Sequence, residues 1–287
     1  MSFIFFKNNH FKYPLNYVFV AMRKKVGLAL GSGGPRGGAH IGVIKVLLEN
    51  NIPIDYIAGS SAGAVVGAYF ALHQSVDELE RLMRNFGKRD MLEILDLNNP
   101  GHSLIKGDKV RNFMNDRFYQ GKSFRDTRIP LRITASVLEN GSLFVFKSGK
   151  IADAVRASGS VPGIFPPVNR RGKHLVDGGL VDPVPIDVVK QMGAEVVIAV
   201  DLSMFAKVKM TNTSSASVLE RSFSILRRKV SDINEILYGN EVLVLRPHVQ
   251  GTDSLTNPMA LYDSKNYIKH GEDIARKALP KIRRLIG

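Results

Sequence analysis

A unit that occurs twice in the first third of the chain most constrains the fold. It consists of a short apolar run, a turn of glycine and other small residues, and a predicted helix. Val26–Leu30 (VGLAL) precedes the glycine-rich turn 31–38 and the helix Ala39–Asn50, and Ile54–Ala58 precedes GSSAG and the helix Ala64–His73. Short apolar runs bounded by polar residues and glycines are typical of buried strands. Their alternation with helices predicts an α/β fold with a parallel sheet and right-handed crossovers.

The later part of the chain adds further elements to this pattern. Strands are expected at Leu131–Leu138, Ser142–Phe146, Lys173–Val176, Val196–Val200 and Val242–Leu245, and helices at Ile151–Ala157, Ile186–Met192 and Ser264–Leu279. Asn140-Gly141 separates the first two strands and is a hairpin signal, which predicts that these two strands are antiparallel.

A helix beginning near Leu219 carries one apolar stripe. Its apolar residues are spaced 4, 3, 4, 3 and 4 apart, at Leu219, Phe223, Leu226, Val230, Ile233 and Leu237. Such spacing places them on one face of an α-helix. We expect this face to pack against the sheet.

Residues 25–287 contain neither an internal repeat nor a convincing linker, and they are predicted to form a single domain. Within them, residues 75–128 form a more polar helical segment that resembles a lid or cap. Its apolar residues are candidates for an acyl-chain pocket or for ordinary core, namely Leu92, Ile94, Leu95, Leu97, Phe113 and Phe118.

Residues 1–24 are a separate basic and apolar extension. Polar residues and Pro14 interrupt its apolar pieces, and it lacks a continuous signal core and a small-residue cleavage site. The apolar runs of the chain fall short of the ~18–20 residues that a membrane-spanning helix needs. The extension is either a membrane-touching arm or an untranslated segment. We favour translation from Met22, which shortly precedes the first strand.

The net charge of +14 is concentrated at the two ends of the chain. Residues 1–25 and residues 265–287 each carry a net +5, so the body between them is near neutral. This distribution argues against a nucleic-acid-binding module. It suits weak contact with a polyanion such as an anionic membrane, or simply a solvated basic surface. The chain contains no cysteine, which excludes disulfides, thiolate nucleophiles and cysteine-based metal sites.

The glycine-rich turn GSGGPRGG has three interpretations besides a plain strand–helix turn. A nucleotide P-loop would need Lys and Ser or Thr where Ala39 and His40 stand. A dinucleotide fingerprint beginning at Gly31 would need glycine at Arg36. The third interpretation is an oxyanion hole, in which backbone N–H groups hold the negative oxygen of a tetrahedral intermediate.

Ser61 is a candidate nucleophile because Gly59-Ser60-Ser61-Ala62-Gly63 matches the pattern G-x-S-x-G. A nucleophilic serine projects from a cramped turn between a strand and a helix. Gly59 and Gly63 relieve the crowding there. The positive end of the following helix favours negative charge that develops at the site. The pattern alone is weak, but its place between a strand and a helix is the required context.

The base for Ser61 is either a histidine or Asp177. By chain order, His248 and His270 are the candidate histidines, and His174 would point away from Asp177 in an extended segment. Asp177 ends a strand immediately before Gly178-Gly179. Its carboxylate is a weak base at its ordinary pKa near ~3.9. Desolvation beside an apolar pocket would raise that pKa toward the useful range.

Four blocks together resemble the patatin-like phospholipases. In order, they are LALGSGGPRGGAHIGVIKVL, IAGSSAGAVVGA, VRASGSVPGIFPPV and LVDGGLVDPVPIDVVKQMGAEVVIAVDL, and the resemblance covers most of residues 25–285. It implies a three-layer α/β/α sandwich with a mainly parallel sheet. It also implies a Ser–Asp dyad without histidine, with Ser61 as nucleophile and Asp177 as base.

The resemblance further assigns the glycine-rich turn to the oxyanion hole. It implies that Gly33, Gly34 and Gly37 place backbone donors and that Arg36 supports the loop. Two departures bear on this assignment. Ser32 stands where the family has the first glycine, and Asp182 stands where it often has Asn. Neither removes a dyad residue.

The activity implied by the resemblance is hydrolysis of acyl esters of phospholipids, lysophospholipids or neutral lipids, without a metal or cofactor. Because similar members include bacterial cytoplasmic proteins, we expect a cytoplasmic protein with peripheral contact to anionic membranes. No prediction of oligomeric state follows. The rival hypotheses are a lipid-binding or regulatory protein with little turnover, which retention of Ser61 and Asp177 disfavours, and a nucleic-acid-binding module, which only the charge suggests.

Overall fold

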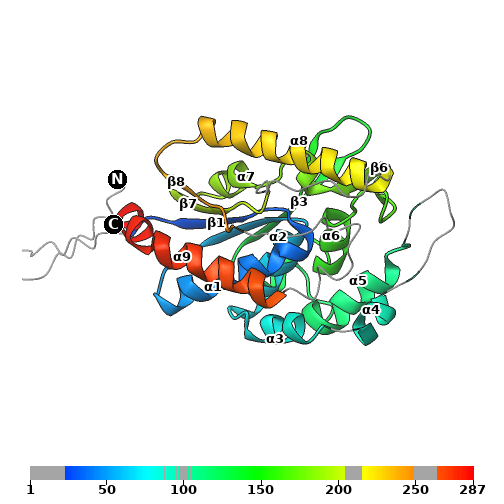
Figure 1. Cartoon of the computed structure of the whole chain (residues 1–287), viewed down its shortest axis with the longest axis horizontal. Helices are drawn as coiled ribbons and strands as arrows, with labels where there is room; N and C mark the ends of the chain where they lie inside the picture. The colour runs from blue at the N-terminus through cyan, green and yellow to red at the C-terminus, as the bar shows by residue number, and fades with distance from the viewer. Residues whose placement is uncertain are drawn as a thin grey trace, which may run out of the picture.

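The computed structural model describes residues 23–86, 88–94, 96, 103, 105–203, 215–248 and 264–287, and its strands form one sheet of eight (Figure 1). The strand order is β5-β6-β3-β2-β1-β7-β8, and β4 pairs with β3 beside that path. The bounds are β1 Val26–Leu30, β2 Tyr56–Ser60, β3 Leu131–Val137, β4 Leu143–Phe146, β5 Val168–Arg170, β6 Lys173–Asp177, β7 Val196–Val200 and β8 Val242–Leu245.

The centre of the sheet is parallel, as predicted from the alternation of strands and helices. Strands β3, β2, β1, β7 and β8 run in one direction, whereas β4 and β6 each pair antiparallel with β3, and β5 pairs antiparallel with β6. The expected hairpin is present, with β3 and β4 antiparallel and Gly141 at a φ of +67°. Strand β2 begins and ends two residues later than predicted, because pairing with β3 keeps Gly59 and Ser60 in the strand.

Helices lie on both faces of the sheet, which confirms the predicted α/β sandwich (Figure 1). The bounds are α1 Gly38–Glu49, α2 Ala62–His73, α3 Asp77–Asn85, α4 Lys88–Ile94, α5 Asp108–Met114, α6 Ile151–Ser158, α7 Ile186–Gln191, α8 Ser215–Leu237 and α9 Ser264–Ile286. Helix α9 continues past Pro280, where the sequence predicted its end. In the described ranges, no helix combines the length and apolar character that crossing a bilayer would require.

The two faces of the sheet are packed differently. The main apolar core joins strand residues such as Leu28, Leu30 and Ile57 to α1, α2, α6 and α9. The opposite face has a smaller apolar cluster, built around Ala29 and Ala58 and covered by α7. Figure 1 places α8 on that second face with α7.

Helix α8 contradicts the expectation that its apolar stripe packs on the sheet. Several of the predicted core positions are exposed, and Leu237 retains 74% of its accessible surface. The exposed apolar residues form what we call the outer stripe, defined as Val218, Leu219, Ile225, Leu226, Ile233, Ile236 and Leu237. Among the residues of α8 whose burial the structure describes, the buried one is the polar Ser231, on the side that faces the sheet.

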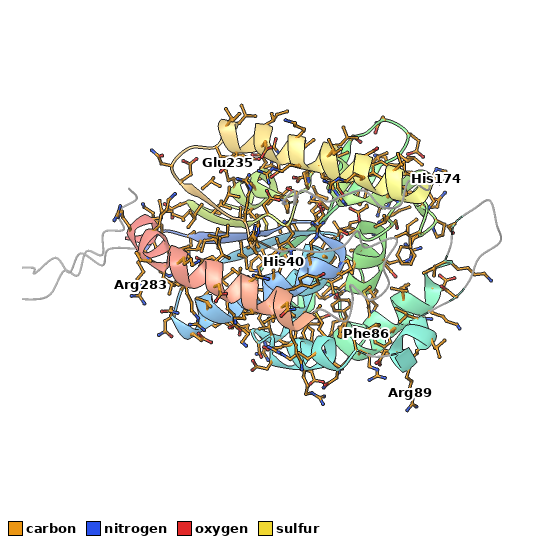
Figure 2. The ribbon with its side chains drawn as sticks, in the orientation of Figure 1. His40, Phe86, Arg89, His174, Glu235 and Arg283 are labelled. Carbon is orange, nitrogen blue, oxygen red and sulfur yellow. The ribbon has the colours of Figure 1, made fainter. Side chains whose placement is uncertain are left out.

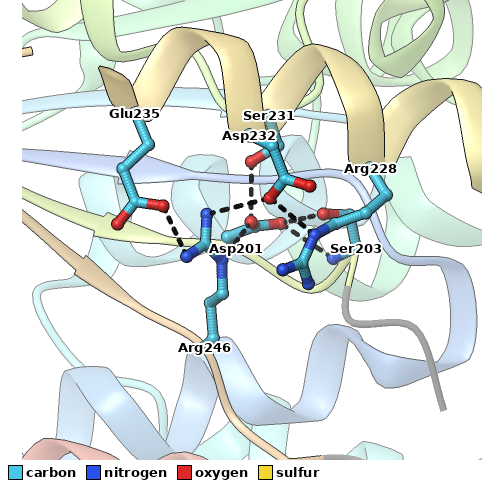
Figure 3. Close-up of polar contacts among 7 residues, drawn as sticks. All are labelled: Asp201, Ser203, Arg228, Ser231, Asp232, Glu235 and Arg246. Atoms are coloured by element: carbon cyan, nitrogen blue, oxygen red, sulfur yellow. Dashed lines mark hydrogen bonds and ion pairs between the residues drawn. The ribbon is translucent and has the colours of Figure 1, made fainter. Parts of the chain in front are cut away.

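A polar network explains this orientation of α8 (Figure 3). Asp201 follows β7 and is buried, and its carboxylate accepts hydrogen bonds from Ser231 Oγ at 2.7 Å and Arg246 Nε at 2.9 Å. Arg246 also pairs with Glu235 of α8 at 2.6 Å. A buried carboxylate without partners is costly, so the polar face of α8 turns toward the sheet.

The segment 75–128 divides between the core and the surface. Phe118 is buried in the main core and Phe113 packs against it, so these two residues are core. Leu92 on α4 is 71% exposed. Leu95 and Leu97 lie outside the described residues, as do residues 1–22 of the predicted extension.

Candidate active site

The register of the sheet brings Ser61 and Asp177 close together, at the carboxyl end of the parallel strands. Ser61 directly follows β2, whose last residue, Ser60, pairs with Thr134 of β3. Strand β3 continues beyond this point, and β6 returns antiparallel along its overhang. Asp177, the last residue of β6, therefore pairs with Ala135, one residue past Thr134. Two residues that are 116 positions apart in sequence thus meet at one edge of the parallel strands.

Ser61 occupies a strained turn between β2 and α2. Its φ of 52° and ψ of −115° are unusual for a residue with a side chain, and such strain is typical of functional turns. The turn requires glycine at both predicted positions. A methyl group on Gly63 would overlap the carbonyl oxygen of Leu30, and one on Gly59 would crowd the backbone of Gly63 and Ala64.

A hydrogen bond joins the two candidate catalytic side chains. Ser61 Oγ donates to Asp177 Oδ2 over 2.6 Å, and both residues are buried. The other oxygen, Asp177 Oδ1, accepts from the amide of Gly179 over 2.8 Å. Burial raises the pKa of Asp177 above its ordinary value, although the bond from Ser61, the positive charge of Arg227 and the Gly179 amide oppose that rise. The direction is the one that a carboxylate base requires.

Close packing surrounds Gly178 and Gly179, which directly follow Asp177. A methyl group on Gly178 would lie 2.6 Å from the Thr134 carbonyl oxygen, and one on Gly179 would overlap Ser32 Oγ. These glycines let the acid loop lie against both β3 and the glycine-rich turn. The side chain of Asp177 is therefore held within reach of Ser61.

The glycine-rich turn follows β1, beside the elbow. The amides of Gly31 and Ser32 donate to the carbonyls of Val200 and Pro183. Within the described ranges, the amides of Gly33 and Gly34 meet no protein acceptor, so they are available to an oxyanion. Arg36 Nε donates to the Gly33 carbonyl over 3.2 Å, a contact within the turn.

Gly37 lies where the turn contacts the elbow. A methyl group at this position would be 3.0 Å from Ala62 Cβ. Glycine therefore permits the turn and the start of α2 to approach closely. Its predicted role as an oxyanion donor stays a prediction.

Within the described ranges, none of the candidate histidines is hydrogen-bonded to Ser61 Oγ or to the carboxylate of Asp177. His174 is exposed and bonds Glu139 through Nδ1 at 2.7 Å, on the opposite face of β6 from Asp177, as expected. His248 is exposed and His270 is only half-buried. His40 is buried beneath the glycine-rich turn, where its Nε2 lies 2.7 Å from the Gly31 carbonyl (Figure 2). Burial lowers the pKa of His40 to about 4, so it is a neutral support.

Three serines that the sequence analysis did not single out form hydrogen bonds with the backbone of Ser61 and Asp177. Ser158 Oγ accepts from the Ser61 amide over 2.7 Å, and the Ser160 carbonyl accepts from the Asp177 amide over 3.0 Å. Ser136 Oγ donates to the Asp177 carbonyl over 2.8 Å. The signal for the first two was the block VRASGSVPGIFPPV, in which Ser158 ends α6 and Ser160 follows it, without a motif of their own.

The arrangement provides a hydroxyl bonded to a buried carboxylate, and the neighbouring turn offers two amides that have no acceptor in the part of the chain that the structure describes. This is the equipment of nucleophilic acyl transfer. Within the described ranges, no group of three or more His, Asp or Glu side chains could hold a metal ion.

Known proteins share this sequence pattern. The family model described as Patatin-like phospholipase matches residues 28–190, a range that includes the glycine-rich turn, Ser61 and Asp177. Patatin-like phospholipase domain-containing protein 6 of Mus musculus is 34% identical over 182 residues, 62% of this chain and 13% of that protein. An uncharacterized NTE family protein of Mycobacterium tuberculosis is 36% identical over 179 residues, 62% of this chain and 49% of that protein. The chain thus spans less than half the length of these relatives.

Solved structures share the fold. VipD from Legionella pneumophila matches with a TM-score of 0.62 at 14% identity, covering 90% of this chain and 67% of that chain. The type III effector protein ExoU matches with a TM-score of 0.51 at 14% identity, covering 90% of this chain and 53% of that chain. At this level of identity, the likeness is one of fold.

Proposed function

The chain belongs to the patatin-like phospholipase family, and we propose that it is a serine acyl-ester hydrolase acting on lipids, of phospholipase A or lysophospholipase type. The observation that carries the proposal is the 2.6 Å hydrogen bond from Ser61 Oγ to the buried carboxylate of Asp177. A serine in a strained elbow, bonded to a carboxylate of raised pKa, is an activated nucleophile.

In the proposed mechanism, Asp177 takes the proton of Ser61 as Ser61 Oγ attacks the ester carbonyl. The amides of Gly33 and Gly34 stabilise the oxyanion of the tetrahedral intermediate. Collapse of the intermediate expels the alcohol, which leaves with the proton from Asp177. A water molecule, activated by Asp177, then releases the fatty acid from the acyl-enzyme. The residues account for each proton transfer without a metal or cofactor.

Labelling by a fluorophosphonate probe tests the proposal. We expect the native chain to be labelled, and Ser61→Ala and Asp177→Asn to lose labelling and ester hydrolysis by about a thousandfold or more. Ser60→Ala is the matched control, since Ser60 is a buried neighbour whose Oγ has no partner among the described residues. Full labelling of Ser61→Ala would refute the mechanism. Lipid binding without acyl release by the native chain would instead favour the regulatory alternative.

A further inference from the structure

Helix α8 presents an extended apolar surface to solvent. The outer stripe contains seven aliphatic residues, and Ile236 and Leu237 at its end are 84% and 74% exposed. A helix of 23 residues spans about 35 Å, so the stripe is long and narrow. Contiguous apolar surface of this kind marks an interaction site.

The charges around the outer stripe favour an anionic partner. Lys229 is exposed among the stripe residues and its ammonium group meets no carboxylate within the described ranges. Asp232 and Glu235 each have a cationic partner, because Asp232 pairs with Arg228 at 2.7 Å and Glu235 pairs at 2.6 Å with Arg246, which it shares with Asp201. A lysine among aliphatic side chains can extend its ammonium group to lipid phosphates while its stem stays in apolar surroundings.

The position of α8 connects this surface to the candidate active site. The helix contacts the turn Gly178–Leu180 that follows Asp177. The positive charge of Arg227, on the inner side of α8, lowers the pKa of Asp177 against the larger effect of burial. Polar contacts through Asp201 and Arg246 attach the helix to the sheet, so its apolar side chains remain free for a partner (Figure 3).

We propose that the outer stripe of α8 docks the protein on the surface of an anionic phospholipid bilayer. The choice of a bilayer as occupant rests on the proposed function, since the bilayer would carry the ester substrate. The stripe has the apolar face and cationic residue of helices that lie in a membrane interface. A second copy of the chain is a poorer occupant, because an apolar contact between two outer stripes would bury the exposed Lys229 of each copy without a carboxylate partner among the described residues.

Flotation of the full-length chain with vesicles tests the docking surface. The vesicles contain phosphatidylcholine alone or equal parts of phosphatidylcholine and phosphatidylglycerol. We expect binding to the mixed vesicles, and a loss of at least about tenfold in the variant Leu226→Ser/Ile233→Ser/Ile236→Ser. The control is Leu92→Ser/Leu138→Ser, at residues that are 71% and 57% exposed elsewhere. It is expected to bind like the native chain.

A charge variant gives an independent measurement. We expect Lys229→Gln to weaken binding to the mixed vesicles roughly fivefold and to leave thermal unfolding unchanged. The matched control is Lys281→Gln, at an exposed position of α9. Absence of vesicle binding by the native chain, or undiminished binding by the triple variant, would overturn the proposal. The proposal would also be overturned if size-exclusion chromatography showed that the native chain is a dimer and that the triple variant, but not the control variants, is a monomer.

Docking and catalysis can fail separately in this experiment. Ser61→Ala is expected to bind vesicles like the native chain while losing probe labelling. The triple variant is expected to hydrolyse a dispersed short-chain ester at the native rate. Vesicle binding that depends on the outer stripe, in a chain without esterase activity, would keep the docking surface and reject the hydrolase. Esterase activity in a native chain that does not bind vesicles would keep the hydrolase and reject the docking surface.

Discussion

The two faces of the sheet are covered in opposite ways. Helices α1, α2, α6 and α9 cover one face through a continuous apolar core, in which strand residues such as Leu28 and Ile57 are fully buried. On the other face, α8 is attached through Ser231, Asp201 and Arg246 and exposes its apolar residues. The first face sets the position of Ser61, because α2, which packs on this face, begins at the residue directly after Ser61. The second face borders Asp177 through Arg227.

This difference indicates separate tasks for the two faces. A close-packed apolar face tolerates little change in volume, which suits a strained elbow. A helix held by polar contacts can open locally at a smaller free energy than the core. We therefore expect changes on the first face to unfold the whole chain, and changes on the second face to act on α8 and on the charge of Asp177.

The largest expected effect is on the packed face, from Gly63→Ala. The added methyl group would overlap the Leu30 carbonyl at the end of β1, and we expect a loss of more than about 4 kcal/mol in the free energy of unfolding. Urea denaturation measures this change. Gly67→Ala in the same helix is the control, because its methyl group would meet side-chain atoms of Ile57 and Leu30 at 3.0 and 3.2 Å rather than a backbone carbonyl. Equal losses of unfolding free energy in the two variants would show that the close contact of Gly63 with the Leu30 carbonyl has no special importance.

On the polar face, Arg246→Met is expected to destabilise the protein by about 3 kcal/mol. Burial would raise the pKa of Asp201, but hydrogen bonds from Ser203, Ser231 and Arg246 hold it below its ordinary value. Without Arg246, the buried carboxylate loses its cation. Hydrogen exchange should locate the loss in α8 rather than in α2. Arg276→Met removes an exposed pair with Glu49 and should change stability by less than about 1 kcal/mol.

A pH-dependent effect is expected from Asp182→Asn. Burial and the charge of Asp187 raise the pKa of Asp182 to about 7. Because the pKa of Asp182 is higher in the folded than in the unfolded chain, protonated Asp182 contributes most to the free energy of unfolding below the unfolded pKa near ~3.9. This contribution is lost as the pH rises through about 7. Asparagine should therefore raise the melting temperature more at pH 8 than at pH 5. The control is Asp273→Asn, at an exposed position, whose effect should be the same at both pH values.

The smallest expected effect is the shift that Arg227→Gln causes in the pH profile of kcat/KM. Burial raises the pKa of Asp177 and Arg227 opposes that rise, so removal of Arg227 raises the pKa further. Since the base acts when ionised, the acidic limb of the profile should move to higher pH. The neighbouring Arg228 pairs with Asp232 instead, so Arg228→Gln should leave that limb in place. An acidic limb that stays in place in Arg227→Gln would show that the charge of Arg227 does not act on Asp177.

Most of the fold could be predicted because its signals are local. Apolar runs bounded by glycines located the central strands, and Asn140-Gly141 located the hairpin. The proposed nucleophile Ser61 was recognisable because a cramped turn requires small residues around it, and Gly63 lies directly against Leu30. Strand ends and Pro280 were less informative, since pairing with neighbours and packing of α9 on α1 decided where those elements end.

By itself, the sequence determined the parallel strands, the glycine-dependent turns, and Ser61 and Asp177 as candidates. Only the tertiary structure decided that β6 returns along the overhang of β3 and brings Asp177 to 2.6 Å from Ser61. It also decided which face of α8 turns outward. The spacing of apolar residues shows where they gather on a helix, but not which surface lies beneath it. Here that surface holds the buried Asp201, and the requirement to pair a buried charge outweighed the burial of the apolar stripe.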